Sequence, residues 1–346
     1  MQVKSRFVAI LTLIFALAAP AVAERPRPLG WAMDAMRAGN WQNAAAIAQR
    51  DGNVAADIIE WHRLRAGRGD YAEVAAFLSR RPDWPGEAYL RRKSEDAVIN
   101  AGRSAVLSFF AERTPQTARG VLAYAKAKTA QGEQGEADVS IVLAWRTMRM
   151  NDTSHAAFIA SHNDLLKPHH NARLSNMLWE GAATDARRML DLVPADQVAL
   201  ARARLALQHL NKDVNGLIDA VPAALRTDAG LQYDRFTWRA RKGRSADAKT
   251  LLRDQSTSAE ALGSPQAWSN RRRSLARDEM RDGDPKLAYQ LASRHFLTTG
   301  SAYADLEWLS GYIALRKLND PTTALGHFLR FDKAILSPIS KSRAGY

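Results

Sequence analysis

A recurring turn motif constrains the fold of this chain more than any other feature of the sequence. Each copy begins at a glycine or asparagine, and a small or apolar side chain follows five residues later, as in Gly39 to Ala44 and Gly243 to Ala248. Copies begin at Gly39, Gly69, Gly102, Gly132, Gly181, Gly243 and Gly283, with weaker copies at Asn211 and Asn319. In chain order the steps between them are 30, 33, 30, 49, 30, 32, 40 and 36 residues. Most of these steps lie near the period of about 34 residues that is typical of repeated helix pairs.

The residues around the turns favour helix ends. Glycine after a helix adopts the left-handed conformation at little cost. Asp284 and Asp320 each precede a proline, which places a capping carboxylate before a proline at the first helical position. The small residue lets the second helix of a pair pack closely on the first.

The repeat predicts an all-α fold. We expect a superhelical array of tetratricopeptide-like helix pairs, an α-solenoid in the form of a ring or arch, that makes one scaffold domain over residues 24–346. The 49-residue step predicts an insertion around residues 151–171. The alternative is an ordinary helical protein that is rich in glycine turns.

Apolar side chains occupy two sides of some predicted helices. In the stretch 306–315 one side carries Leu306, Leu309 and Ile313, and the other carries Trp308, Tyr312 and Leu315. A helix that lies between two neighbours is expected to bury both sides.

The first residues are typical of a secretory signal peptide. Lys4 and Arg6 precede an apolar run at residues 7–19, and Ala21-Val22-Ala23 has the small-x-small pattern of a cleavage site. We therefore predict a signal peptide at residues 1–23, with cleavage after Ala23. The alternative is a short membrane anchor, although 13 apolar residues are few for a bilayer span.

Charge and cysteine content narrow the classes of function. The chain has no cysteine, which excludes disulfide scaffolds, zinc–cysteine sites, iron–sulfur clusters and cysteine nucleophiles. Its formal net charge is +13, which favours an anionic partner. Since an exported protein rarely meets nucleic acid, we expect no nucleic-acid partner and, in the mature chain, no integral membrane segment.

No motif for catalysis, cofactor binding or metal binding is found. His155, His162 and His169 are seven residues apart and His170 is adjacent, but Pro168 would break a helix that aligned them. Glu307 lies among apolar residues, where a carboxyl group with a raised pKa is conceivable; pairing with a neighbouring arginine is the favoured interpretation. The sequence therefore predicts no catalytic residue, no cofactor and no metal.

Clusters of basic residues are the candidates for ligand binding. We expect five arginines to contact an anionic glycan on a concave surface: Arg187, Arg188, Arg271, Arg272 and Arg273. The alternative is that these clusters are solvated helix faces.

Much of the chain from about Trp84 onward resembles a known helical scaffold. The resemblance lies in Arg271 to Arg277, in Tyr303 to Arg316, and in His327-Phe328 and Pro338-Ile339-Ser340. Earlier pieces are Arg92 to Ala97, His170 to Leu174, Leu178-Trp179 and Tyr233-Asp234-Arg235. These segments resemble the superhelix of the soluble lytic murein transglycosylases of Gram-negative bacteria.

The resemblance implies a periplasmic protein that acts in cell-wall turnover. Members of that family cleave peptidoglycan glycan strands and leave 1,6-anhydromuramic ends, and they do so with a separate C-terminal lysozyme-like domain. That domain's Glu-Ser, Gly-Leu-Met-Gln and Ala-Tyr-Asn-x-Gly motifs do not occur in these 346 residues. No catalytic residue is therefore carried over, and we expect no glycan cleavage by this chain alone.

Two functional hypotheses follow. In the first, the chain is the peptidoglycan-binding scaffold of a truncated or split transglycosylase, with peptidoglycan and a separate catalytic domain or cell-wall enzyme as partners. In the second, it is a stand-alone periplasmic adaptor of the tetratricopeptide type that binds a protein or peptide.

Overall fold

The computed structural model describes residues 28–345, with side chains through residue 342. The predicted signal peptide at residues 1–23 lies outside the described residues. The chain divides into two compact units, one ending at Ala137 and the other beginning at Asp138. Each unit is described by itself.

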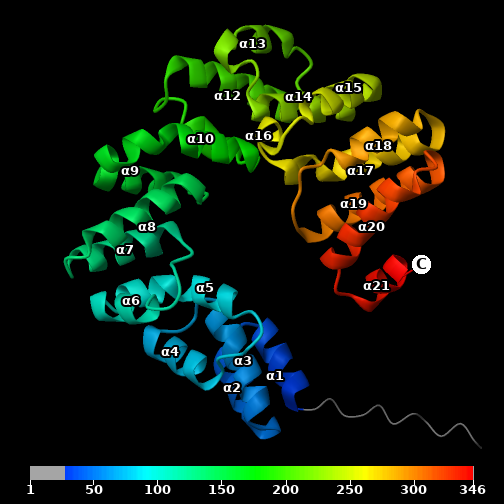
Figure 1. The fold of residues 1–346 in the computed structure, drawn as a ribbon. Coiled ribbons are helices and arrows are strands. Elements are labelled where there is room, and N and C mark those ends of the chain that lie inside the picture. Colours follow the sequence, from blue (N-terminus) through cyan, green and yellow to red (C-terminus); the bar gives the residue numbers. More distant parts are fainter. Residues whose placement is uncertain (1–27, 346) are drawn as a thin grey trace, which may run out of the picture. The chain divides into compact units, whose positions relative to one another are not determined.

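The first unit is a run of helices joined by short turns (Figure 1). It contains α1 (Pro28–Arg37), α2 (Trp41–Ala48), the 3-10 turn η1 (Gln49–Asp51), α3 (Asn53–Arg65), α4 (Tyr71–Arg80), α5 (Glu87–Asn100), α6 (Arg103–Phe109), α7 (Ala118–Thr129) and the start of α8 (Gln134–Thr147).

The second unit continues in the same manner. It contains most of α8, then α9 (Asp152–Leu166), η2 (Lys167–His169), α10 (His170–Trp179), α11 (Ala183–Arg188), α12 (Ala195–Gln208), α13 (Asn215–Asp219), η3 (Ala223–Leu225), α14 (Ala229–Arg241), α15 (Ser245–Gln255), α16 (Ala259–Leu262), α17 (Pro265–Asp282), α18 (Pro285–Ser293), α19 (Gly300–Lys317), α20 (Pro321–Ala334) and α21 (Pro338–Gly345).

The prediction of an all-α array of helix pairs is confirmed. No residue in 28–345 belongs to a β-strand. Consecutive helices pack on one another: α17 contacts α18, α18 contacts α19, and α19 contacts α20. The fold therefore defines the chain as an α-helical repeat protein.

The repeat motif marks the turn inside each pair. Its small residue is fully buried at Ala44, Ala186, Ala248 and Ala288, as close packing of the second helix requires. The turn residue adopts a left-handed conformation at Gly39, Gly102, Gly132, Gly181, Gly243 and Asn319. In the second copy the left-handed residue is Gly67 instead of Gly69, because the turn there begins two residues earlier.

Both predicted Asp-Pro caps are present. The Asp284 carboxylate accepts a hydrogen bond from the backbone N–H of Lys286, and the Asp320 carboxylate accepts one from that of Thr323. Each following proline is the first residue of its helix, where its missing N–H removes no intrahelical bond. These caps fix the starts of α18 and α20.

The insertion predicted around residues 151–171 is an additional helix, α9, followed by the single turn η2. Pro168 lies in η2, and α10 begins only at His170. The predicted break before the histidine pair is therefore confirmed.

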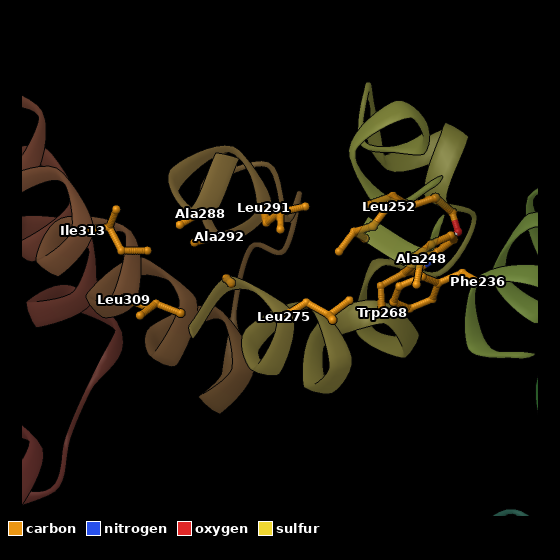
Figure 2. Close-up of a cluster of buried hydrophobic side chains, with 12 residues drawn as sticks. Phe236, Ala248, Leu252, Trp268, Leu275, Ala288, Leu291, Ala292, Leu309 and Ile313 are labelled. Atoms are coloured by element: carbon orange, nitrogen blue, oxygen red, sulfur yellow. The ribbon is translucent and has the colours of Figure 1, made fainter. Parts of the chain in front are cut away.

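A continuous apolar core runs through the later helices of the second unit (Figure 2). Phe236 of α14 stacks on Trp268 of α17, with ring centroids 4.8 Å apart. The core continues through Ala248, Leu252, Leu275, Ala288, Leu291, Ala292, Leu309 and Ile313. Each large apolar side chain buried here contributes about 1.5–3 kcal/mol to the free energy of folding.

The first unit has its own core, which α3 to α7 share. Phe77 is fully buried and its ring lies 5.8 Å from that of Trp84, edge to face. None of the helices in residues 28–345 combines the length and the apolar character that a bilayer crossing needs.

Of the two apolar sides of α19, one is buried more completely than the other. Leu306, Leu309 and Ile313 are fully buried. On the other side Trp308 and Tyr312 are half-buried, while Leu315 is 40% exposed.

Candidate functional site

The second unit has a cavity of about 340 Å³ between three helices. The helices are α10, α12 and α14, the first helices of three consecutive pairs. We call this cavity the aromatic hollow. Its lining consists of Leu178, Trp179, Glu180, Gly181, Leu207, Gln208, His209, Tyr233, Asp234, Thr237 and Arg241.

The repeat itself gathers these side chains. In each of the three pairs the first helix ends in a turn, and Gly181 makes that turn in a left-handed conformation (φ +64°) after α10. Equivalent positions of successive pairs lie next to one another in a helical-repeat array. The last turns of α10 and α12 and one side of α14 therefore form one wall together.

Two aromatic rings form the apolar part of the hollow. Trp179 stacks on Tyr233, with centroids 5.3 Å apart and ring planes at 29°. The Arg204 guanidinium lies 5.2 Å from the Trp179 ring centroid, and Tyr233 also contacts Trp268 edge to face. Since these neighbours hold both rings in place, the apolar wall is formed before any ligand arrives.

The polar floor of the hollow centres on Asp234, which is 3% exposed. Its carboxylate accepts a hydrogen bond of 2.7 Å from Arg204 Nε and one of 3.1 Å from Gln208 Nε2. Gln208 Nε2 also donates to the Leu178 carbonyl at 2.9 Å, which ties α12 to the end of α10. Burial raises the pKa of Asp234, and the Arg204 charge and hydrogen bonds oppose that rise.

Two polar groups at the hollow lack a partner among the residues that the structure describes. Thr237 Oγ1 is buried and has no hydrogen-bond partner in the protein. Arg241 is exposed, and it has no ion-pair partner among residues 28–342. A polar ligand in the hollow would therefore meet both a hydroxyl group and a free guanidinium.

The structure brings one of the five predicted arginines to the edge of the hollow. Arg187 is exposed and donates from Nη2 to Nε2 of His209 at 2.8 Å, which places the histidine proton on Nδ1. Arg188 instead contacts Asp152, Asp185 and the Met150 carbonyl. Arg188 therefore joins α11 to the start of α9 and does not face the hollow.

The other three predicted arginines lie on α17, which does not line the hollow. Arg272 is fully buried and donates to the Leu291 carbonyl at 2.9 Å and to Ser256 Oγ at 2.6 Å. This leaves Arg272 no surface for a ligand, and burial lowers its pKa to about 9. Arg273 pairs with Asp305, and Arg271 is half-exposed.

Glu307 is a centre of ion pairing. Arg330 Nε donates to its carboxylate at 2.9 Å, His327 Nδ1 does so at 2.6 Å, and His295 Nε2 lies 3.2 Å from the other oxygen. Burial alone would raise the pKa of Glu307, but the hydrogen bonds from both histidines and the Arg330 charge lower it to about 2. The pairing interpretation is therefore confirmed, and the raised pKa that a general acid needs is contradicted.

The hydrogen bonds around Glu307 also fix the tautomer of His295. His295 Nδ1 accepts from the Leu297 backbone N–H, so its proton is on Nε2 and points to Glu307. His327 Nδ1 lies 2.6 Å from a Glu307 carboxylate oxygen and 2.8 Å from Arg330 Nη2, and its Nε2 lies 2.9 Å from the Tyr289 hydroxyl. The cluster thus connects α18, α19 and α20 through a chain of polar contacts.

His155 and His170 serve as packing groups. His155 and His170 both contact the ring of Trp145, with centroids 5.0 and 5.6 Å away. Burial lowers the pKa of His155 to about 4 and also lowers the pKa of His170. Within the described part of the chain, no group of three or more potential ligands is placed to hold a metal ion.

The sequence analysis did not identify the hollow as a site. Leu178-Trp179 and Tyr233-Asp234 entered it only as parts of the family resemblance. The sequence carries no local signal for the hollow, because Trp179 ends α10 whereas Tyr233 lies in the first half of α14, and their proximity depends on the register of the repeat.

Comparisons with known proteins identify no family for this chain. No protein-family model matches the chain, and no curated protein matches it. A solved structure of a tetratricopeptide repeat protein from Parabacteroides merdae ATCC 43184 is 12% identical, and the match covers 92% of this chain and 95% of that one with a TM-score of 0.24.

Proposed function

We propose that this chain is a periplasmic, non-catalytic binding module that holds peptidoglycan glycan strands during cell-wall turnover. The observation that carries this proposal is the aromatic hollow, in which an apolar wall, a hydrogen-bonding floor and two arginines without a carboxylate partner among the described residues, Arg187 and Arg241, surround one cavity. The resemblance to the transglycosylase scaffold supports the choice of peptidoglycan over other polymers.

The chemistry of the hollow suits a charged sugar polymer. Sugar rings have C–H surfaces that pack on aromatic walls such as Trp179 and Tyr233, and hydroxyl groups that need partners such as Thr237. The muramyl lactyl groups and stem peptides of peptidoglycan carry carboxylates. Arg187 and Arg241 supply positive charge at the hollow for these groups.

Binding is proposed without bond cleavage. Glycoside cleavage needs a carboxylic acid that can give a proton to the leaving oxygen. The buried carboxylate of the hollow, Asp234, is held in an ion pair with Arg204 at 2.7 Å. We expect purified protein to release no anhydro-muropeptides from sacculi, and release of these products would overturn this part of the proposal.

A pull-down on purified sacculi tests the binding. Protein retained by sacculi is measured across a series of NaCl concentrations, and retention should fall as salt screens the arginines. The double variant Arg187→Gln/Arg241→Gln should lose most of its retention at moderate salt. Both side chains are exposed, so the variant is expected to fold normally.

A matched control separates the hollow from net charge. The double variant Arg253→Gln/Arg281→Gln removes the same charge from exposed sites away from the hollow, and it should bind sacculi like the unmodified protein. Equal loss in both variants would show that binding follows net charge alone. No retention of the unmodified protein at low salt would refute the proposed function.

A second candidate function is a periplasmic adaptor for a protein or peptide. It is favoured by exposed apolar side chains at the last two helices: Leu325, Leu329, Leu336 and Ile339 are 54% to 94% exposed. Exposed apolar groups that are close together mark interaction surfaces. If the adaptor is correct, Leu325→Glu/Leu329→Glu should abolish co-purification of a periplasmic partner, while the hollow variant should leave it intact.

A further inference from the structure

A second, smaller cavity of about 60 Å³ lies on another part of α14. We call it the arginine cavity. Its lining consists of Leu207, Val214, Asn215, Ile218, Arg235, Trp238, Arg239 and Arg244. Its lining therefore includes three arginines and no acidic residue.

The arginine cavity is separate from the aromatic hollow. Residues 233, 237 and 241 of α14 line the hollow at spacings of four, so they share one side of the helix. Arg235 and Arg239 are also four apart, but they are two residues out of phase with that set. At 3.6 residues per turn this places them toward the opposite side of α14.

Two of the three guanidinium groups lack a carboxylate. Arg235 Nη1 donates to the amide oxygen of Gln232 at 3.3 Å, and Arg239 Nη1 donates to the Asp247 backbone carbonyl at 3.3 Å. The Asp247 carboxylate itself pairs with Arg244, whose Nε lies 2.7 Å from Oδ2. Among the described residues, no acidic side chain neutralises Arg235 or Arg239.

This arrangement of like charges costs free energy. Like charges four residues apart on a helix repel each other. Arg235 is also half-buried. Burial, and to a lesser extent the charge of Arg239, lower the pKa of Arg235. A ligand with negative charge would remove the repulsion and supply the missing hydrogen-bond acceptors.

The size and walls of the cavity limit the ligand. A single water needs about 10–15 Å³ by the same measure, so 60 Å³ accommodates a group of a few heavy atoms and no sugar ring. The Trp238 ring is fixed as one wall because its Nε1–H donates to the Asn211 carbonyl at 3.1 Å. The paired N–H donors of an arginine guanidinium match the oxygen atoms of a planar carboxylate or a tetrahedral phosphate group.

We propose that the arginine cavity binds a compact oxyanion, a carboxylate or phosphate group, between Arg235 and Arg239. The group is either a free ion or the charged end of a larger ligand. This site is independent of the proposed glycan binding, because it lies on another side of α14 and shares only Leu207 with the hollow.

Thermal unfolding and calorimetry with defined anions test the proposal. Sodium phosphate, sodium acetate and N-acetyl-alanine are each exchanged for NaCl at pH 7 and constant ionic strength, and N-acetyl-alanine amide serves as the uncharged probe. At least one of the three anions should raise the Tm in a saturable manner and give a measurable Kd. A response to phosphate or acetate indicates a free ion, whereas a response confined to N-acetyl-alanine indicates the charged end of a larger ligand.

Variants tie the response to the cavity. Arg235→Gln/Arg239→Gln should weaken binding by at least about tenfold, since each charge-assisted hydrogen bond contributes strongly to affinity. Without ligand, this variant should unfold at the same or a higher temperature than the unmodified protein, because the repulsion is gone. Arg253→Gln/Arg281→Gln is the matched control and should bind normally.

Two results would overturn the proposal. One is the absence of any response beyond that to NaCl with all three anions. The other is an equal response of the unmodified protein and the Arg235→Gln/Arg239→Gln variant, which would place the anion elsewhere. Neither result depends on whether the protein binds sacculi.

Discussion

Replacement of Glu307 by glutamine tests whether the ion-pair cluster stabilises the last two helix pairs. The side chain of Glu307 is 6% exposed and accepts hydrogen bonds from Arg330 and two histidines. Glutamine has nearly the same shape, but its amide nitrogen would face a hydrogen-bond donor. Because glutamine is neutral, it would also no longer balance the charge of Arg330. The variant therefore removes the electrostatic contribution and leaves the packing of α19 and α20 in place.

The magnitude follows from the pKa of Glu307. Its fall from 4.5 to about 2 corresponds to about 3 kcal/mol, at about 1.4 kcal/mol per pH unit. Because the pKa is lowered on folding, this stabilisation is complete above pH 5 and is lost as the pH falls toward 2. Between pH 5 and pH 3.5 the unmodified protein should lose about 1 kcal/mol from this group.

Hydrogen exchange of the α19 and α20 backbone amides is the appropriate assay, because repeat arrays open locally. At pH 5 the opening free energy of these helices should be about 3 kcal/mol lower in Glu307→Gln than in the unmodified protein. At pH 3.5 this gap should narrow by about 1 kcal/mol, since protonation removes the charge from the unmodified protein alone.

A control variant accompanies this measurement. Glu180→Gln changes an exposed glutamate elsewhere in the second unit, and it should alter the opening free energy of α19 and α20 by less than about 0.5 kcal/mol. A gap that is the same at pH 5 and pH 3.5 would refute the reasoning, because a purely structural role of Glu307 has no such pH dependence.

Two further predictions concern buried arginines, and urea unfolding measures both. Gly230→Ala should destabilise the protein by about 1–3 kcal/mol, because the new Cβ would overlap the Arg204 guanidinium that Asp234 holds in place. The same change elsewhere in a helix usually stabilises by about 1 kcal/mol, so a gain in stability would contradict this prediction. Arg272→Met should change stability by less than about 1 kcal/mol, because it removes a buried charge that has no carboxylate partner among the described residues. Arg272→Ala should destabilise the protein by about 3 kcal/mol, because it leaves a cavity. Equal losses of stability in both variants would contradict this prediction.

The fold was predictable because local chemistry determines most of it. Glycine at the turns, Asp-Pro at the starts of α18 and α20, and the small residue five positions later all act within one helix pair. The extra helix α9 appeared in the sequence as one long step in the repeat. In the second copy the sequence alone could not tell which glycine takes the left-handed conformation, because Gly67 and Gly69 lie in one turn and are chemically equivalent; the structure gives it to Gly67.

The candidate site was less predictable because it depends on contacts between pairs. Three arginines in a row on α17 gave no indication that Arg272 points into the core while Arg271 and Arg273 do not. Only the helical position of each side chain against its neighbours decides this. The Trp179–Tyr233 stack similarly joins residues 54 positions apart, which no local pattern reports.

The packing of helices against their neighbours in sequence has a consequence for how the chain folds. Each pair finds most of its partners within about one repeat of chain, so little entropy is lost in closing long loops. Folding is then expected to begin at any well-capped pair, such as α19 and α20, and to spread to adjacent pairs. A chain of this kind acquires its structure segment by segment, and it does not need its two ends to meet before the middle is stable.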